Sequence, residues 1–321
     1  MKVSVVIACF NSAAFIEAAV RSVLTQTLSD LECIAVDDAS ADGTVDVLRR
    51  LADEDRRLRV LALPKNGGPS AARNAGIDEA CGDFVAVLDS DDAYHPTRLE
   101  KLVALAERAD ADLMADNQVV VAEDDGRNLG LAFQFERQGE PVGIDLTRFL
   151  KGSIPVRGEY SLGYLKPVMR RAFLARHGLR YDLRYSVGED FLFYVNALLR
   201  GGRFCVTNEP LYVYTKRARS LTRSGGWTLR VLAAMSREIL DMPGMTLPSA
   251  GREALEERYD ILRRRAQALD LADCLRARDP RRAAALLARE PVALAALGRE
   301  LLDVGRRRFQ SRVMIGEGRA Q

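Results

Sequence analysis

The stretch Phe-Val-Ala-Val-Leu-Asp-Ser-Asp-Asp at residues 84–92 decides the fold that we expect. Its apolar run, 84–88, is typical of a strand buried in a parallel sheet. Asp89, Asp91 and Asp92 follow at the carboxyl end of this strand, where open α/β folds bind their ligands. Close carboxylates repel unless protons or a cation neutralise them, and Mg²⁺ shares such acids with phosphate oxygens. The stretch therefore predicts a metal and diphosphate site; a solvated acidic loop is the alternative.

Composition limits the classes of protein to consider. The chain has 321 residues, 48% hydrophobic and 29% charged, enough for one large or two moderate globular domains. A net charge of +2 gives no reason to expect nucleic-acid binding. The five cysteines lack paired metal spacing, so we expect reduced thiols in a cytoplasmic protein. We see neither a signal peptide nor a transmembrane run, so we expect any membrane contact to be peripheral, on the inner face.

The rest of the chain alternates between apolar runs and helical patterns. This rhythm predicts an α/β fold with a mostly parallel, doubly wound sheet. Three of the loops carry polar side chains to one edge of that sheet. The expected strands are 3–9, 31–36, 58–63, 84–88, 112–121, 204–206 and 211–214. Helices are expected from Ser12 to Thr27, directly after Thr44, near Pro69, from Pro96 to Arg108, from an opening at 165–171 to Gly178, and over 191–199.

Three other kinds of nucleotide-binding protein do not fit. A dinucleotide-binding domain should carry its glycine-rich fingerprint directly after the first strand, but the turn at 10–14 contains no glycine. A nucleotidyltransferase should carry a glycine-rich, lysine-containing loop at the same place, and a phosphate-binding loop of the Walker type is also missing. The acids after the second and fourth strands instead suit a nucleotide whose diphosphate is held with a metal.

Four segments in order resemble the family 2 glycosyltransferases of the GT-A fold. They are Val-Ser-Val-Val-Ile-Ala-Cys-Phe-Asn (3–11), Val-Asp-Asp-Ala-Ser-Ala-Asp-Gly-Thr (36–44), Asn-Gly-Gly-Pro-Ser-Ala-Ala-Arg-Asn-Ala-Gly-Ile (66–77) and Asp-Ser-Asp-Asp (89–92). Gly-Glu-Asp at 188–190 resembles the acceptor-side motif of the same family, and 164–223 is similar to the bacterial exopolysaccharide branch, including succinoglycan-type glucosyltransferases. The resemblance covers about two thirds of the chain.

The resemblance implies a role for each matching residue on the donor side. It implies that Asp38 reads the nucleotide base, that Asp89 contacts the ribose and that Asp91 ligates Mg²⁺ or Mn²⁺. The backbone around Ala8 and Phe10 would wall the base, Arg73 would hold the nucleotide or its phosphates, and Ser90 would belong to the same donor site.

Simpler readings compete with two of these roles. Asp38 could instead cap the helix that follows it, because Asp is a favoured N-cap residue. Arg73 could be a surface residue paired with Asp78 or Glu79. The order of the motifs favours the functional reading for both residues.

The second half should supply the catalytic base. The family assigns this role to the Asp of the Glu-Asp pair, here Asp190, with Glu189 as its orienting neighbour or an acceptor ligand. A carboxylate within hydrogen-bond reach can remove the proton of a sugar hydroxyl as the hydroxyl attacks. One base and no carboxylate nucleophile imply, through the family mechanism, inversion at the anomeric carbon. The alternative is a pair of acids that cap the next helix.

Basic residues after the last strand could close on the diphosphate. Arg219 and Arg223 are the candidates for such a lid, and the glycines at 225–226 would permit movement. A solvated basic loop is the alternative. The Gln-x-x-Arg-Trp motif of processive relatives is missing here, so we expect one sugar per encounter.

We expect a catalytic domain at 1–225, with a nucleotide-sugar half at 1–115 and an acceptor half at 116–225. Residues 226–321 are predicted to be helical, with amphipathic helices that pack on the catalytic domain or on a second copy of the chain. A membrane-surface platform built on the arginines at 306–308 is the alternative.

Together these features predict a metal-dependent, inverting hexosyltransferase. We expect a UDP-sugar donor, with UDP-glucose as the first choice, and a saccharide or lipid-linked oligosaccharide acceptor at the cytoplasmic face, in the synthesis of an exopolysaccharide or another cell-surface glycan. A non-catalytic sugar-nucleotide-binding protein is the alternative.

Overall fold

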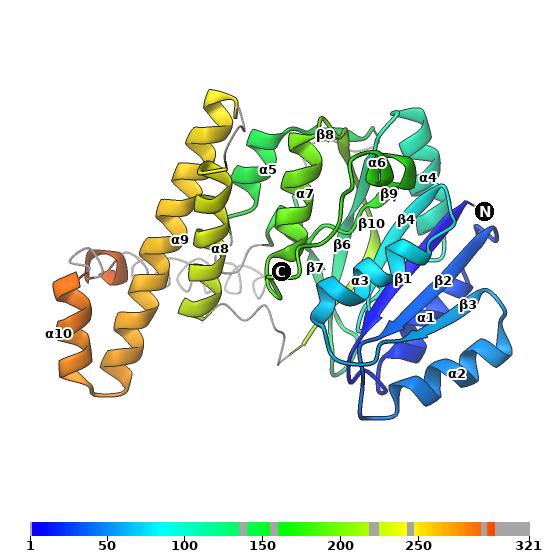
Figure 1. The fold of residues 1–321 in the computed structure, drawn as a ribbon, viewed down its shortest axis with the longest axis horizontal. Helices are drawn as coiled ribbons and strands as arrows, with labels where there is room; N and C mark the ends of the chain where they lie inside the picture. Colours follow the sequence, from blue (N-terminus) through cyan, green and yellow to red (C-terminus); the bar gives the residue numbers. More distant parts are fainter. Residues whose placement is uncertain are drawn as a thin grey trace, which may run out of the picture. The chain divides into compact units, whose positions relative to one another are not determined.

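Four parallel strands form the half of the sheet that contains the N-terminus (Figure 1). In the computed structural model they are β1 (Val3–Cys9), β2 (Leu31–Asp37), β3 (Leu58–Ala62) and β4 (Phe84–Asp89), in the order β3-β2-β1-β4. Each lies within one residue of its predicted range. The structure describes residues 2–134, 140–154, 160–217, 225–242, 247–289 and 294–298.

The second half of the sheet is mixed. It continues from β4 through β9 (Val168–Arg170), β6 (Leu113–Ala122) and β10 (Phe204–Lys216) to β5 (Ala93–Tyr94). β10 runs parallel to β6, whereas β9 is antiparallel to both β4 and β6. β7 (Asn128–Leu131) pairs with β6, and β8 (Val142–Ile144) pairs with β10. The expected α/β fold with a parallel core is confirmed.

Two predicted elements of this half are wrong. The helix expected to open at 165–171 begins only with α6 (Arg171–Arg176), because 168–170 form strand β9 between two buried neighbours. Such pairing with distant strands overrides local helical pattern. The two strands expected at 204–206 and 211–214 are one strand, β10, whose register against β6 shifts on either side of Pro210. Proline cannot donate to a strand ladder, which explains an irregularity there.

Helices cover both faces of the parallel half. Alternate residues of the strands contact α1 (Ile16–Leu24), α2 (Thr44–Glu54) and α4 (Arg98–Arg108) in one core cluster. On the other face, α3 (Gly68–Glu79) lies against β1 and β2. The approach is close, since a Cβ on Gly76 would lie 2.3 Å from Cγ1 of Val6. The carboxyl ends of β1, β2 and β4 consequently remain open at one edge.

Three helical segments that follow β8 in the chain pack against one another. They are α5 (Leu146–Gly152), the short 3₁₀ helix η1 (Leu162–Tyr164) and α7 (Glu189–Leu199). Phe149 of α5 stacks on Phe191 of α7, with ring centroids 5.8 Å apart. α7 starts at Gly188, whose positive φ of 77° suits glycine. This turn places Glu189 and Asp190 in the first turn of the helix.

The chain divides into two compact units, Met1–Ser220 and Leu221–Gln321. The second contains α8 (Gly226–Leu240), α9 (Ser249–Arg276) and α10 (Pro280–Arg289), in agreement with the helical pattern. Within the described ranges, no helix combines the length and apolar character needed to cross a membrane. The proposed lid residues Arg219 and Arg223, and the arginines at 306–308, lie outside the described residues.

Candidate active site

Loops from three strands meet at the carboxyl edge of the parallel half. The N–H of Asn11, after β1, donates to Oγ of Ser40, after β2, at 2.8 Å. Oγ of Ser12 lies 2.9 Å from Oγ of Ser90, which follows β4. The structure thus brings together the three polar loops that the sequence predicted to share this edge, and Ser90 lies among them.

The residues expected to wall the base lie at the end of β1. Ala8 stands between Val36 of β2 and Asp89 of β4 in the sheet register. Phe10 follows and is half exposed, at 49%. An aromatic ring left open beside a polar loop offers a surface on which a planar base can stack.

Asp38 binds the start of α3. Its Oδ1 accepts the N–H of Gly67 at 2.8 Å, and its Oδ2 accepts the N–H of Gly68 at 2.7 Å. The reading of Asp38 as the cap of the following helix is wrong, because α2 begins at Gly43 without a side-chain cap. The buried Asp38 carboxylate therefore fixes the β2 loop to α3, and its role in reading a base stays a prediction.

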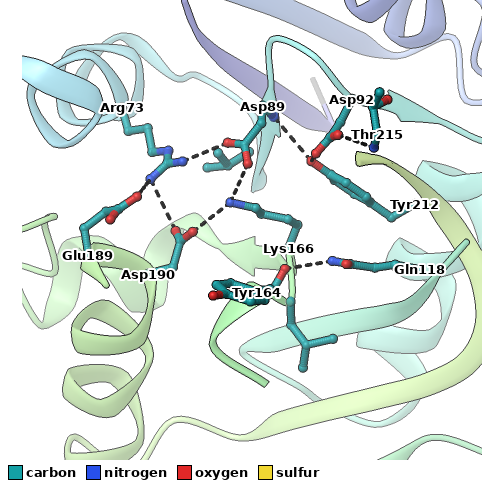
Figure 2. A network of polar contacts seen from close by, with 12 residues as sticks. Arg73, Asp89, Asp92, Gln118, Tyr164, Lys166, Glu189, Asp190, Tyr212 and Thr215 are labelled. Carbon is teal, nitrogen blue, oxygen red and sulfur yellow. Dashed lines mark hydrogen bonds and ion pairs between the residues drawn. The ribbon is translucent and has the colours of Figure 1, made fainter. Parts of the chain in front are cut away.

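Arg73 lies at the centre of an acidic cluster (Figure 2). Its Nη2 is 2.8 Å from Oδ1 of Asp89, and its Nη1 is 2.7 Å from Oε1 of Glu189 and 3.4 Å from Oδ1 of Asp190. The guanidinium is buried, with 5% of the side chain exposed. The reading of Arg73 as a surface residue paired with its own helix is wrong. The structure joins the donor-side acid after β4 to the acceptor-side acids of α7.

Lys166 is a second cation in this cluster, and the sequence reasoning gave it no role. Its Nζ lies 2.9 Å from Oδ2 of Asp89 and 2.7 Å from Oδ2 of Asp190. Burial alone would lower the pKa of this amino group, but the carboxylates of Asp190 and Asp89 raise it above its ordinary value. The lysine therefore stays charged at neutral pH. A single lysine in the otherwise apolar run Leu-Lys-Pro-Val-Met at 165–169 is the sequence signal that could have found it.

Both cations favour the ionised form of the acids around them, but they outweigh burial at Asp89 and not at Glu189. Burial would raise the pKa of Asp89, yet Lys166 and Arg73 outweigh it and hold that pKa well below its usual range. The pKa of Glu189 is raised instead, because burial and the charge of Asp190 exceed the effect of Arg73. The cluster thus holds Asp89 as an anion and keeps Glu189 easier to protonate.

The other two acids after β4 differ in their surroundings. Asp92 is buried and accepts hydrogen bonds from the Tyr212 hydroxyl at 2.6 Å and the Thr215 N–H at 2.8 Å, both from β10. Asp91 is 30% exposed, and Oδ2 lies 3.3 Å from Nη1 of Arg217. Burial and the charge of Asp89 raise the pKa of Asp91. Asp92 therefore serves the structure, whereas Asp91 is a partly buried acid whose ionised form a further cation would stabilise.

The acids after β4 could bind a metal ion only if a bound ligand supplied the rest of the coordination of the ion. Among the residues that the structure describes, no three His, Cys, Asp or Glu side chains are grouped as a metal site. Asp89 and Asp91 each keep 30% of the side chain exposed, but both oxygens of Asp89 already contact Arg73 and Lys166, whereas Asp91 contacts Arg217 through Oδ2. A Mg²⁺ or Mn²⁺ ion held by one carboxylate takes its remaining ligands from phosphate and water oxygens. The residues present fit a cation shared with a diphosphate.

The mixed sheet, with the loops after β1, β2 and β4 converging at one edge, has the GT-A fold of the transferases to which it is similar. The family model for glycosyl transferase family 2 matches residues 4–173. The chain belongs to this family.

Relatives and solved structures agree with this placement. The succinoglycan biosynthesis protein ExoO of Rhizobium meliloti is 39% identical over 221 residues, which are 69% of this chain and 62% of that protein. The chain thus spans less than two thirds of this relative. TarS 1–349 of S. aureus, solved with UDP-GlcNAc, is 22% identical with a TM-score of 0.64, covering 91% of this chain and 92% of that one. The mannosyltransferase PcManGT of Pyrobaculum calidifontis, solved with GDP-Man and Mn²⁺, is 20% identical with a TM-score of 0.55, covering 94% and 87%.

Proposed function

We propose that this protein is a metal-dependent, inverting hexosyltransferase. One observation carries the proposal: Asp89 after β4 and Asp190 at the start of α7 are held by the same two buried cations. The first acid belongs to the strand edge where a nucleotide binds. The second is the candidate base. A donor sugar and the proton acceptor for its attacking hydroxyl would thus meet in one place.

The donor would lie along the edge formed by β1, β2 and β4. Phe10 offers an exposed aromatic surface to the base, and Asp89 is held ionised for a ribose hydroxyl. Family membership and the UDP-GlcNAc bound to TarS support a nucleotide-sugar donor. We choose UDP-glucose as the first donor to test, because residues 164–223 resemble the succinoglycan-type glucosyltransferases.

Asp91 would hold Mg²⁺ or Mn²⁺ against the diphosphate. When bound, the ion would neutralise negative charge on the departing diphosphate. The Mn²⁺ present with PcManGT supports this choice of metal. Arg217, which now contacts Asp91, lies close enough to interact with the same phosphates once a donor is present.

Asp190 would act as the general base. Its carboxylate takes the proton of the acceptor hydroxyl as the oxygen forms a bond to the anomeric carbon. The bond from that carbon to the diphosphate breaks on the opposite side, and its electron pair leaves with the diphosphate. A single displacement inverts the centre, so an α-linked donor yields a β-glycoside.

The acceptor would be a saccharide on a lipid carrier, used in building an exopolysaccharide at the cytoplasmic face of the membrane. The likeness to ExoO, a succinoglycan biosynthesis protein, supports this assignment. Tyr160 packs edge-on against Tyr214 and against the buried Phe133, with centroids 5.7 and 6.5 Å apart, and the two partly exposed tyrosines would offer a surface to the acceptor sugar.

The test measures donor binding and donor hydrolysis with UDP-, GDP- and dTDP-sugars, with and without Mg²⁺ or Mn²⁺. Asp91→Ala should lose the metal dependence, and Asp190→Asn should bind the donor but release nucleoside diphosphate about 10²–10⁴-fold more slowly. Asp46→Ala is the matched control, because Asp46 is an exposed acid on α2. It should behave as wild type.

Either of two results would overturn the proposal. Binding of no sugar nucleotide by the wild type would refute the transferase assignment. Full turnover in Asp190→Asn would show that another group is the base.

A further inference from the structure

The segment that carries Lys166 is fixed by side chains from three other elements. Carbonyl oxygens of residues 164, 165 and 166 each accept a hydrogen bond from a buried side chain. The donors are Gln118 Nε2 of β6 to Tyr164 at 2.7 Å, Tyr194 Oη of α7 to Leu165 at 2.8 Å, and Arg98 Nη2 of α4 to Lys166. Figure 2 shows the first of these contacts beside the lysine. Buried carbonyl oxygens need hydrogen-bond partners, and here side chains from three separate elements supply them, so the segment presents the lysine in one defined position.

The side chain of Lys166 then spans two elements that the chain keeps 101 residues apart, the end of β4 and the start of α7. It is 7% exposed and shares one ammonium group between Oδ2 of Asp89 and Oδ2 of Asp190. The three N–H groups of a lysine ammonium, at the end of a flexible side chain, can donate to two carboxylates at once. Arg73 already contacts both Asp89 and Asp190, so neither acid would be left without a cation if Lys166 were absent. A second buried cation that bridges the same two acids therefore points to a role beyond charge neutralisation.

We propose that Lys166 is a positioning residue that aims Asp190 at the acceptor hydroxyl and ties it to the donor-side acid Asp89. The assignment rests on the proposed transferase function. Lys166 holds Oδ2 of Asp190 at 2.7 Å, whereas the contact of Oδ1 with Arg73 is longer, at 3.4 Å. The lysine thereby fixes the carboxylate plane and directs Oδ1 to the reacting hydroxyl. Its contact with Asp89 sets that direction relative to the bound donor.

The test is a double-mutant cycle between Lys166 and Asp190 in the full chain. The rate measured is nucleoside diphosphate release, with water as acceptor, from the sugar nucleotide that the wild type binds. Lys166→Met should lower kcat about 100-fold, since small misplacements of a reacting group cost rate on this scale. Lys166→Arg keeps the charge but changes the geometry and should recover part of that loss. Lys101→Met, at an exposed pair with Glu209, is the matched control.

The cycle separates positioning from general support of the fold. If Lys166 acts through Asp190, Lys166→Met changes kcat less than about threefold when Asp190→Asn is already present. An equal loss in both backgrounds, or a loss confined to donor KM, would overturn the proposal. Should Lys166→Met fail to fold, the same cycle run with Lys166→Arg decides, because it retains the buried charge.

The proposed function and the Lys166 assignment fail differently. A wild type that binds no sugar nucleotide refutes the function, and the lysine assignment falls with it. A wild type that turns over while Lys166→Met matches it in kcat refutes the lysine assignment alone.

Discussion

Removing the Arg73 guanidinium tests how the active-site charges are held. The side chain is 5% exposed and contacts Asp89, Glu189 and Asp190 at 2.8, 2.7 and 3.4 Å. Breaking a buried ion pair by deleting one partner costs about 3–5 kcal/mol, because the opposite charge stays buried. Lys166 still neutralises two of the three acids. We therefore expect Arg73→Met to cost about 3 kcal/mol, at the low end of that range.

Thermal and urea unfolding at pH 7 provide the assay. A loss of about 3 kcal/mol lowers Tm by about 6–12 °C in a unit of this size. Arg21→Met is the matched control, since Arg21 also contacts two acids, Glu17 and Glu54, but at the surface. Its unfolding should stay close to that of the wild type.

The pH dependence of the stability lost in Arg73→Met adds a second test. Without Arg73, Asp89 and Glu189 lose a cation that lowers their pKa, so the pKa values of these two acids rise in the folded state. Burial and Asp190 already raise the pKa of Glu189. Protonation as the pH falls toward about 5 then relieves the repulsion, and the stability difference from wild type should shrink. This account of the cluster would be refuted if Arg73→Met unfolded at the same midpoint urea concentration as the wild type at pH 7.

Three further predictions concern the fold. Hydrogen bonds from Ser4, the Cys81 N–H and Arg59 outweigh burial and lower the pKa of Glu32. Its contribution to stability is present above its unfolded pKa and is lost as the pH falls through the lowered folded pKa, so urea unfolding of Glu32→Gln should show a cost of about 1 kcal/mol at pH 7 that shrinks as the pH falls into the acid range. Gly76→Ala should cost about 1–3 kcal/mol in the same assay through overpacking against Val6, whereas Gly143→Ala, with open space around its Cβ, should cost less. Cys81 is exposed and should react first with a thiol reagent in the native protein, and Cys81→Ser should remove that fast phase, because burial raises the pKa of the core thiols.

The sequence by itself determined the parallel half of the sheet. Apolar runs such as 84–88 are too short for helices and too continuous for surface strands, so their location follows from local pattern. The polar loops after β1, β2 and β4 could be placed together for the same reason, because parallel strands end at one edge. The order of motifs also indicated the family, which the match over residues 4–173 confirms.

Only the tertiary structure decided how the charges meet. Local sequence predicts a helix at 168–170, but pairing with β4 and β6 makes this segment a strand. That pairing places Lys166 beside Asp89 and Asp190. Burial, and therefore the ionisation of Glu189 and Asp89, depends on which distant elements pack around each group. Strand and helix periods are local properties of a chain, whereas the electrostatics of a buried cluster belong to the folded molecule as a whole.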